Sequence, residues 1–228
     1  MSAAHRKQAY FVTGTDTGVG KTMVSSMLVR QFAARGLRSV GMKPIASGCE
    51  RQNEQLISED VTQLLAASNV ELSLSDINPY VFEPAIAPHI AAKQAGVKID
   101  LDHILAAFER LQSQADVVIV EGAGGFYVPL DDRHDIADLA AKLGVPVILV
   151  VGMRLGCINH ALLTAEAIRQ RGLALAGWVA NQADPRMAML EENLQTLKQR
   201  MPAICLGLVP WQEQTDMPGG TDIVRALL

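Results

Sequence analysis

The sequence has few of the residues that build disulfide frameworks or metal clusters. It contains only three cysteines, Cys49, Cys157 and Cys205, which lie far apart and form no C-x-x-C pair. Its five histidines are scattered rather than grouped. Because zinc sites and disulfide scaffolds have closely spaced ligands, neither is indicated, and we expect the cysteines to be reduced thiols.

The chain also lacks a basic excess and any long apolar run. Lys and Arg number 20 against 24 Asp and Glu, which gives a formal net charge of -4 and a pI near 5.7. Such a balance argues against nucleic acid or an anionic membrane as a partner. Residues 1–8 have no signal-peptide core, and no stretch is long enough to span a bilayer, so we expect a cytoplasmic protein.

The remaining composition is that of a folded globular protein. Hydrophobic residues make up 49% of the chain and charged residues 19%, a balance that argues against disorder. A length of 228 residues fits one continuous core. We therefore expect a single domain over residues 1–228.

Apolar runs alternate with helical patterns along the chain. Two of the runs, at 117–120 and 147–151, are continuously apolar, as expected for parallel strands covered by helices on both faces. The sequence therefore predicts an α/β fold with one doubly wound, mostly parallel sheet. The predicted strands are 10–13, 39–43, 117–121, 145–151, 175–181 and 204–209. The predicted helices are 22–35, about 58–67, about 86–94, 101–114, 135–143, 159–171 and about 185–200.

A glycine-rich turn follows the first predicted strand and opens a helix. It reads Gly14-Thr15-Asp16-Thr17-Gly18-Val19-Gly20-Lys21-Thr22. In such a loop the backbone N–H groups and the lysine bind the β- and γ-phosphates of a nucleotide, and the threonine hydroxyl ligates magnesium. The spacing is one residue longer than the usual pattern, and a glycine-rich hairpin is the alternative. The strand-loop-helix setting favours a nucleotide.

A second lysine ends the next strand. Lys43 ends the strand predicted at 39–43 and Ser47 follows it, and the carboxyl ends of parallel strands meet at one edge of a sheet. Lys43 is therefore expected near Lys21, where two ammonium groups indicate phosphoryl chemistry. A solvated lysine is the alternative.

Carboxylates are available to complete a magnesium site. Glu121 ends the third strand before a glycine-rich turn, and Asp60 opens a helix. Magnesium prefers oxygen ligands, so both are candidates beside Thr22. Compensation of the helix N-terminus would also explain Asp60, and a tight turn alone would explain the glycines.

The fourth and fifth strands end in further polar groups. Residues 152–160 enter a helix whose free N–H groups can hold a carboxylate, although the residues alone favour an ordinary loop with Asn159 as N-cap. Asn181 and Gln182 stand where GTPases carry the guanine-reading N-K-x-D pattern, but Gln182 replaces the lysine, and an Asn amide can read adenine. Trp211 is placed to border a base, or to join the core.

Taken in order, six motifs resemble the dethiobiotin synthetase family: GTDTGVGKT, MKPIASG, VEGAGG, LGCINH, GWVANQ and VPW, from about residue 10 to residue 211. The resemblance implies a phosphate-loop NTPase fold and a homodimeric ligase that uses ATP and Mg²⁺. It closes a ureido ring on 7,8-diaminononanoate with carbon dioxide or bicarbonate and releases ADP and phosphate. A carbamate and a mixed carbamic-phosphoric anhydride are the implied intermediates.

The resemblance also implies roles for individual residues. The implied catalytic residues are Lys43, Lys21, Thr17 and Ser47. The residues implied to bind magnesium are Thr22, Asp60 and Glu121. Those implied to bind ATP further include Gly18, Val19, Gly20, Gly122, Ala123 and Gly124, with Asn181, Gln182, Pro210, Trp211 and Gln212 beside the adenine. Those implied to bind the diamine are Thr17, Lys43 and Ser47, joined across the dimer interface by Leu155, Gly156, Cys157 and Asn159.

Three positions depart from the family pattern. Gly18 replaces a glutamate found in some relatives, Gln182 replaces an aspartate, and Asn193 stands where a tyrosine is expected. These departures concern nucleotide selectivity and the contact to the partner's substrate.

A phosphate-loop ATPase switch of the partitioning or septum-site type is the alternative function. Such switches carry a signature lysine five residues before the invariant lysine, and this position is Asp16 here. The chain also has no basic face for a DNA-linked switch. Both features favour the ligase.

Overall fold

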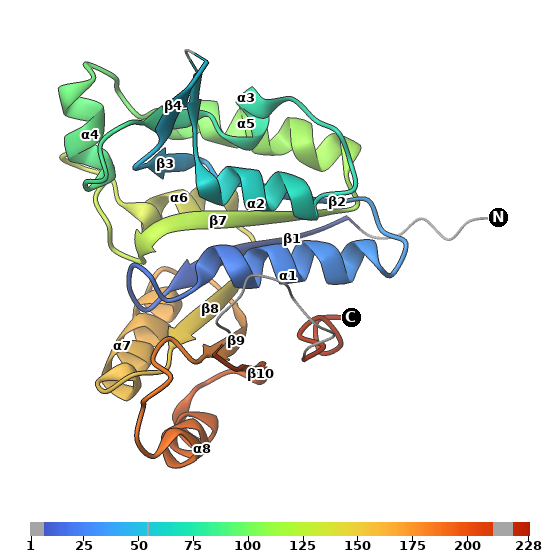
Figure 1. The fold of residues 1–228 in the computed structure, drawn as a ribbon, viewed down its shortest axis with the longest axis vertical. Helices are drawn as coiled ribbons and strands as arrows, with labels where there is room; N and C mark the ends of the chain where they lie inside the picture. Colours follow the sequence, from blue (N-terminus) through green and yellow to red (C-terminus); the bar gives the residue numbers. More distant parts are fainter. Residues whose placement is uncertain (1–6, 54, 212–220) are drawn as a thin grey trace.

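The computed structural model describes residues 7–53, 55–211 and 221–228 (Figure 1). Its centre is a six-stranded sheet of order β10-β9-β8-β1-β7-β2 in which every neighbouring pair is parallel. The predicted doubly wound α/β fold is therefore confirmed. The strands are β1 (Gln8–Gly14), β2 (Ser39–Met42), β7 (Val117–Gly125), β8 (Val147–Gly152), β9 (Leu175–Asn181) and β10 (Cys205–Val209).

Helices cover both faces of this sheet. Alternate side chains of β8 are buried on opposite faces: Ile148 packs in the cluster that contains α1, whereas Leu149 packs in the cluster of α7 and α8. Phe11 of β1 joins α5 and α6 on the latter face. In the described part of the chain no helix is long and apolar enough to cross a membrane. The helices are α1 (Lys21–Ala33), α2 (Glu59–Ala67), α3 (Leu74–Ile77), α4 (Pro88–Gln94), α5 (Leu101–Gln114), α6 (Ile136–Leu143), α7 (Cys157–Gln170) and α8 (Leu190–Arg200).

Two small sheets that the sequence analysis did not predict lie between β2 and α4. β3 (Ile45–Ser47) pairs in parallel with β6 (Tyr80–Phe82), and β4 (Glu50–Gln52) forms an antiparallel pair with β5 (Gln55–Ile57). These strands are too short to show a hydrophobic period. β3, β4 and β5 carry the chain from β2 to α2, whereas β6 follows α3 and leads to α4 (Figure 1).

Several predicted boundaries were wrong. α8 begins at Leu190 rather than near residue 185, because residues 182–189 form extended and turn structure and Met189 at the N-cap has a left-handed backbone with φ of 54°. α7 begins at Cys157 and its N-cap is Gly156, so Asn159 lies inside the helix and is not its N-cap. β2 ends at Met42, whereas β7 continues to Gly125.

Side chains cover the outer edge of β2. The Ser39 N–H donates to Asn69 Oδ1 at 2.7 Å, and the Gly41 N–H donates to Ser68 Oγ at 3.1 Å. The Asn69 N–H in turn donates to the Ser39 carbonyl at 3.2 Å. Both N–H groups and the Ser39 carbonyl at this edge therefore have partners within the chain.

The segment 221–228 packs against α1 and β10. The Gln31 carboxamide donates to the Thr221 carbonyl at 3.0 Å and accepts from the N–H groups of Ile223 at 3.0 Å and Val224 at 3.3 Å. Ile223 and Val224 are fully buried. Thr221 Oγ1 donates to the Leu208 carbonyl of β10 at 2.8 Å. One polar side chain thus joins the segment to the helix that follows the phosphate loop.

Candidate functional site

The glycine-rich loop joins β1 to α1 in a conformation that only glycine accommodates well. Gly18 and Gly20 have φ values of 72° and 86°. A Cβ on Gly20 would lie 2.2 Å from Asn181 Nδ2. Gly20 is the N-cap of α1 and no side chain caps the helix, so its first N–H groups are available to an anion. This geometry is that of a phosphate loop.

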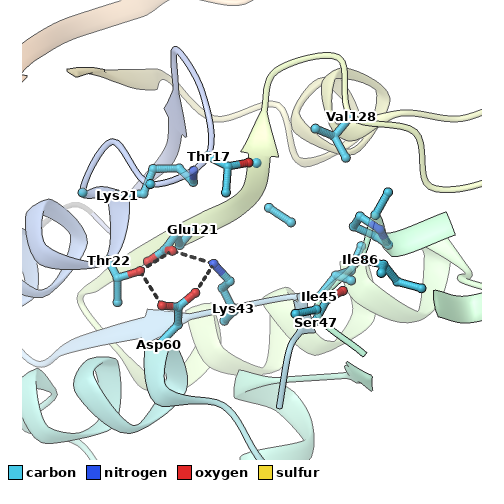
Figure 2. Close-up of a pocket in the computed structure, with 17 residues that line it drawn as sticks. Thr17, Lys21, Thr22, Lys43, Ile45, Ser47, Asp60, Ile86, Glu121 and Val128 are labelled. Atoms are coloured by element: carbon cyan, nitrogen blue, oxygen red, sulfur yellow. Dashed lines mark hydrogen bonds and ion pairs between the residues drawn. The ribbon is translucent and has the colours of Figure 1, made fainter. Parts of the chain in front are cut away.

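A buried ion cluster lies directly beside this loop. Lys43 follows β2 and Glu121 lies in β7, and the parallel pairing of Met42 with Val120 sets the two side chains at the same level. Lys43 Nζ is 2.6 Å from Glu121 Oε1 and 2.8 Å from Asp60 Oδ2, where Asp60 is in the first turn of α2 (Figure 2). Lys43 and Glu121 are only 4% and 1% exposed. These contacts between predicted site residues were not foreseen from the sequence.

Three oxygen-bearing side chains meet at the same point. Thr22 Oγ1 is 2.8 Å from both Asp60 Oδ1 and Glu121 Oε1 (Figure 2). A hydroxyl has one proton, so it can donate to only one of these carboxylates at a time. Glu121 Oε2 is buried and has no hydrogen-bond partner. Two carboxylates and a hydroxyl with unused acceptor capacity fit a hard divalent cation such as magnesium.

The described residues form no larger cluster of metal-binding side chains. No group of three or more His, Cys, Asp or Glu side chains there could hold a metal ion. Cys49 and Cys157 are buried free thiols, and burial raises the pKa of each. The two cysteines therefore stay as uncharged thiols near neutral pH.

The electrostatics of the cluster favour its charged form. Burial opposes the charge of Lys43, but attraction to Glu121 and Asp60 outweighs it and raises the Lys43 pKa above its ordinary value. Burial also opposes the charge of Asp60, yet Lys43 lowers the pKa of this carboxyl. By contrast, burial and then repulsion from Lys43 lower the pKa of Lys21 to about 8. An approaching phosphate would therefore stabilise the charged form of Lys21 more than that of Lys43, which two carboxylates already stabilise.

A cavity of about 700 Å³ opens beside the loop and the cluster. Thr17, Lys21 and Thr22 line one side and Lys43 and Asp60 its floor (Figure 2). The opposite end is apolar. Further lining residues are Gly18, Gly20, Ile45, Ser47, Ala85, Ile86, Ala87, Pro88, Glu121, Ala123, Gly124 and Val128.

The cavity thus joins most of the residues predicted for phosphates, metal and diamine. Ser47 Oγ is buried without a hydrogen-bond partner, so it too has capacity for a ligand. Gly122 lies beside the cluster, with its carbonyl 3.5 Å from Lys43 Nζ. The apolar residues Ile86 and Val128 were not foreseen, because single hydrophobic residues in loops carry no signal of their own.

The residues predicted to border adenine lie on the other side of the loop. Asn181 ends β9, is 6% exposed, and donates from Nδ2 to the Val19 carbonyl at 2.8 Å. Asn181 is therefore in direct contact with the phosphate loop. This contact ties the end of β9 to the loop.

Gln182 and Trp211 lie next to each other beyond β9 and β10. Gln182 Oε1 accepts a hydrogen bond from the Trp211 N–H at 3.1 Å. Trp211 is 45% exposed, which excludes the alternative that it is a core residue, and Pro210 is also exposed. Gln212 lies outside the described residues. None of the three described residues lines the main cavity.

The start of α7 also lies outside this cavity. Leu155 is 99% exposed, and Gly156 and Asn159 are exposed, whereas Cys157 is buried. The helix start has no side-chain cap and no acidic residue in its first turn. Free N–H groups at this helix start can therefore donate hydrogen bonds to a carboxylate from outside this chain's own cavity.

Known proteins match most of the length of this chain. A family model described as an AAA domain matches residues 8–218. The ATP-dependent dethiobiotin synthetase BioD of Aromatoleum aromaticum is 56% identical over 203 residues, which cover 89% of this chain and 90% of that protein. The protein of the same name from Nitrosospira multiformis is 54% identical over 209 residues, with coverage of 92% and 91%.

Solved structures share the fold at much lower identity. The MinD cell division protein of Aquifex aeolicus matches with a TM-score of 0.58 at 13% identity, covering 96% of this chain and 94% of that one. This likeness concerns the fold alone. The high identity and near-complete coverage of the sequence relatives confirm the resemblance read from the motifs, and the chain belongs to the ATP-dependent dethiobiotin synthetase family.

Proposed function

We propose that this protein carboxylates 7,8-diaminononanoate with carbon dioxide and closes the ureido ring of dethiobiotin at the expense of ATP, acting in the cytoplasm as a magnesium-dependent homodimer. We treat residues 1–228 as one ligase domain. The observation that carries the proposal is the cavity in which a phosphate loop, a charged Lys43 and an oxygen-rich cluster face an apolar wall. Its polar side suits a triphosphate, and its apolar end suits a methylene chain.

The phosphate loop binds and orients the nucleotide in this proposal. Lys21 and the free N–H groups at the start of α1 hold the β- and γ-phosphates. Thr22, Asp60 and Glu121 would hold magnesium, which would neutralise phosphate charge. Asn181, Gln182 and Trp211 border the adenine at the ends of β9 and β10. Gly20 leaves the space that Asn181 needs to approach the loop.

The reaction proceeds in three balanced steps. One amine of the diamine adds to carbon dioxide, loses a proton and becomes a carbamate. A carbamate oxygen then attacks the γ-phosphorus, and the bond from that phosphorus to the bridging oxygen breaks. ADP departs, and a mixed carbamic-phosphoric anhydride is formed. Finally the neighbouring amine attacks the carbonyl carbon, loses a proton and expels phosphate, which closes the ring.

Lys43 stabilises the negative charge that moves during these steps. Its ammonium is held charged between two carboxylates at the cavity floor. From there it faces the place where the carbamate and the transferring phosphoryl group meet. Thr17 and Ser47 offer hydroxyl groups to the carbamate and amines. Catalysis of this kind consists mainly of positioning and charge neutralisation.

The far carboxylate of the substrate binds to a second copy of the chain in this proposal. Leu155 and Asn159 are exposed at the start of α7 and lie outside the cavity of their own chain. In a dimer, the N–H groups of this helix start can reach the partner's site. Sedimentation would show whether the active species is a dimer.

One assay separates the ligase from the alternative switch function. Purified protein with Mg-ATP and bicarbonate should release phosphate only when the vicinal diamine is added. Equal hydrolysis without the diamine would favour an ATPase switch. The engagement of Asp16 by Arg154, rather than a lysine at position 16, already supports the ligase.

A further inference from the structure

A charged pair joins the phosphate loop to the segment before α7. Arg154 Nη2 forms an ion pair and hydrogen bond with Asp16 Oδ2, across 138 positions of sequence. The other carboxylate oxygen, Asp16 Oδ1, accepts the Thr17 N–H at 2.7 Å. The Asp16 carbonyl accepts Lys21 Nζ at 3.1 Å. Asp16 therefore contacts both a substrate residue and a phosphate residue of the proposed site while it is held by Arg154.

The pair lies at one end of a longer seam between the loop and β8. The Thr15 N–H donates to the Val150 carbonyl at 3.0 Å, and the Gly152 N–H donates to Thr15 Oγ1 at 3.3 Å. A Cβ on Gly152 would lie 2.6 Å from Val19 Cγ1, so the loop packs tightly against the end of β8. Up to Thr15 these hydrogen bonds and this packing fix the loop. Beyond Thr15, Asp16 continues this connection through its side chain.

We propose that Asp16 and Arg154 form a positioning pair for the ring-closing reaction. The pair holds Thr17 and Lys21 of its own site in fixed relation to the start of α7, the surface proposed to take the carboxylate of the substrate bound in the partner's site. This inference rests on the proposed function. Asp16 Oδ1 holds the backbone N–H of Thr17, and the Thr17 side chain lines the cavity (Figure 2).

Because the pair is exposed, we infer that it contributes to the positions of the site residues and little to the stability of the fold. The side chains of Arg154 and Asp16 are 43% and 49% exposed, and exposed ion pairs add little to the stability of a fold. The effect on the reaction rate can be much larger than the effect on stability, because a displacement of about 1 Å in an active site can lower the rate about a hundredfold. Arginine suits this task, since its planar guanidinium has a defined donor geometry that lysine lacks.

The test compares Arg154→Met and Arg154→Lys with the matched control Arg169→Met. Arg169 is also an exposed arginine, lies in α7, and pairs with Glu166 at 2.6 Å away from the cavity. Diamine-dependent phosphate release, the KM values for ATP and diamine, and the thermal midpoint would be measured for each. We expect Arg154→Met to lower kcat at least about tenfold, with KM for ATP changed less, Arg154→Lys to recover part of the loss, and all midpoints to stay near that of Arg169→Met.

A double-mutant cycle shows whether the two residues act as a unit. If they do, Asp16→Asn combined with Arg154→Met loses no more activity than Arg154→Met alone. Arg154→Met with wild-type kcat, or a loss of activity that only follows a lowered midpoint, would overturn the proposal.

Hydrogen exchange tests the pair independently of the substrate. The amide of Thr17 should exchange faster in Arg154→Met than in the wild type and in Arg169→Met, and unchanged exchange would refute the positioning role. If the wild type showed no diamine-dependent phosphate release, the proposed function would fail, whereas this exchange measurement would still decide on the pair.

Discussion

Replacing Lys43 by glutamine tests the buried cluster most directly. Lys43 Nζ lies 2.6 Å from a glutamate side chain with no exposed surface, and removing one partner of a buried ion pair typically costs about 3–5 kcal/mol. We expect the loss in free energy of unfolding to lie at the lower end of this range. The Asp60 side chain is 42% exposed and stays hydrated, and the Thr22 hydroxyl still donates to Glu121. A loss of about 3 kcal/mol corresponds to a midpoint lower by about 6–12 °C for a chain of this size.

The same substitution should separate catalysis from nucleotide binding. Lys43→Gln removes the charge that stabilises the transferring phosphoryl group, so we expect turnover to fall by about two orders of magnitude or more. ATP affinity should stay close to the wild-type value, because Lys21 and the loop are unchanged. The measurements are diamine-dependent phosphate release, equilibrium binding of ATP, and thermal unfolding.

Lys142→Gln is the matched control for this experiment. Lys142 pairs with Asp102 at 2.8 Å on the surface, where the Asp102 side chain is 80% exposed. This variant should unfold and turn over like the wild type. If Lys43→Gln bound no ATP, Lys43 would act on the ground state, and if it kept full turnover, the assigned role in phosphoryl transfer would be wrong.

Three further substitutions or conditions test other parts of the structure. Gly20→Ala should abolish nucleotide binding in a dialysis assay, since φ is 86° and the new Cβ would meet Asn181 at 2.2 Å; an affinity like that of the wild type would contradict the loop geometry. Nucleotide affinity should fall as the pH rises above about 8, because the protonated form of Lys21 binds the phosphates. The fall should be up to about tenfold per pH unit, and Lys21→Arg should remove this pH dependence because arginine stays charged. Gln31→Ala should lower the free energy of unfolding in urea by about 1–3 kcal/mol, because three buried backbone groups lose their partner; no change would mean that the segment 221–228 is held by its apolar side chains alone.

Most of the main sheet could be predicted from the sequence because its strands are buried on both faces. The continuous apolar run at 117–120 has no other simple explanation, and glycines after the helices mark where they end. The segment 70–80 could not be assigned. It contains α3, a single turn whose Asp76 is held by Arg110 of α5 at 2.8 Å. Such a long-range ion pair leaves no local pattern.

The candidate site could also be predicted only in part from the sequence. Lys21, Lys43 and Glu121 could be predicted to meet because parallel strands end at one edge of the sheet. Their mutual contacts could not, since the spacing of residues does not tell whether a lysine faces a phosphate or a carboxylate. Arg154 was missed for the same reason, because its partner Asp16 lies 138 positions away.

The side chains that cover β2 also limit how copies of this chain can associate. Ser68 and Asn69 occupy the N–H groups of Ser39 and Gly41 that a foreign strand would have to use, which opposes growth of a continuous intermolecular sheet at this edge. A concentrated solution of the protein is thereby protected against one common route to aggregation. Self-association through this side of the molecule would have to rely on side-chain surfaces instead, and such contacts, unlike a backbone ladder, can be strengthened or abolished by a single substitution.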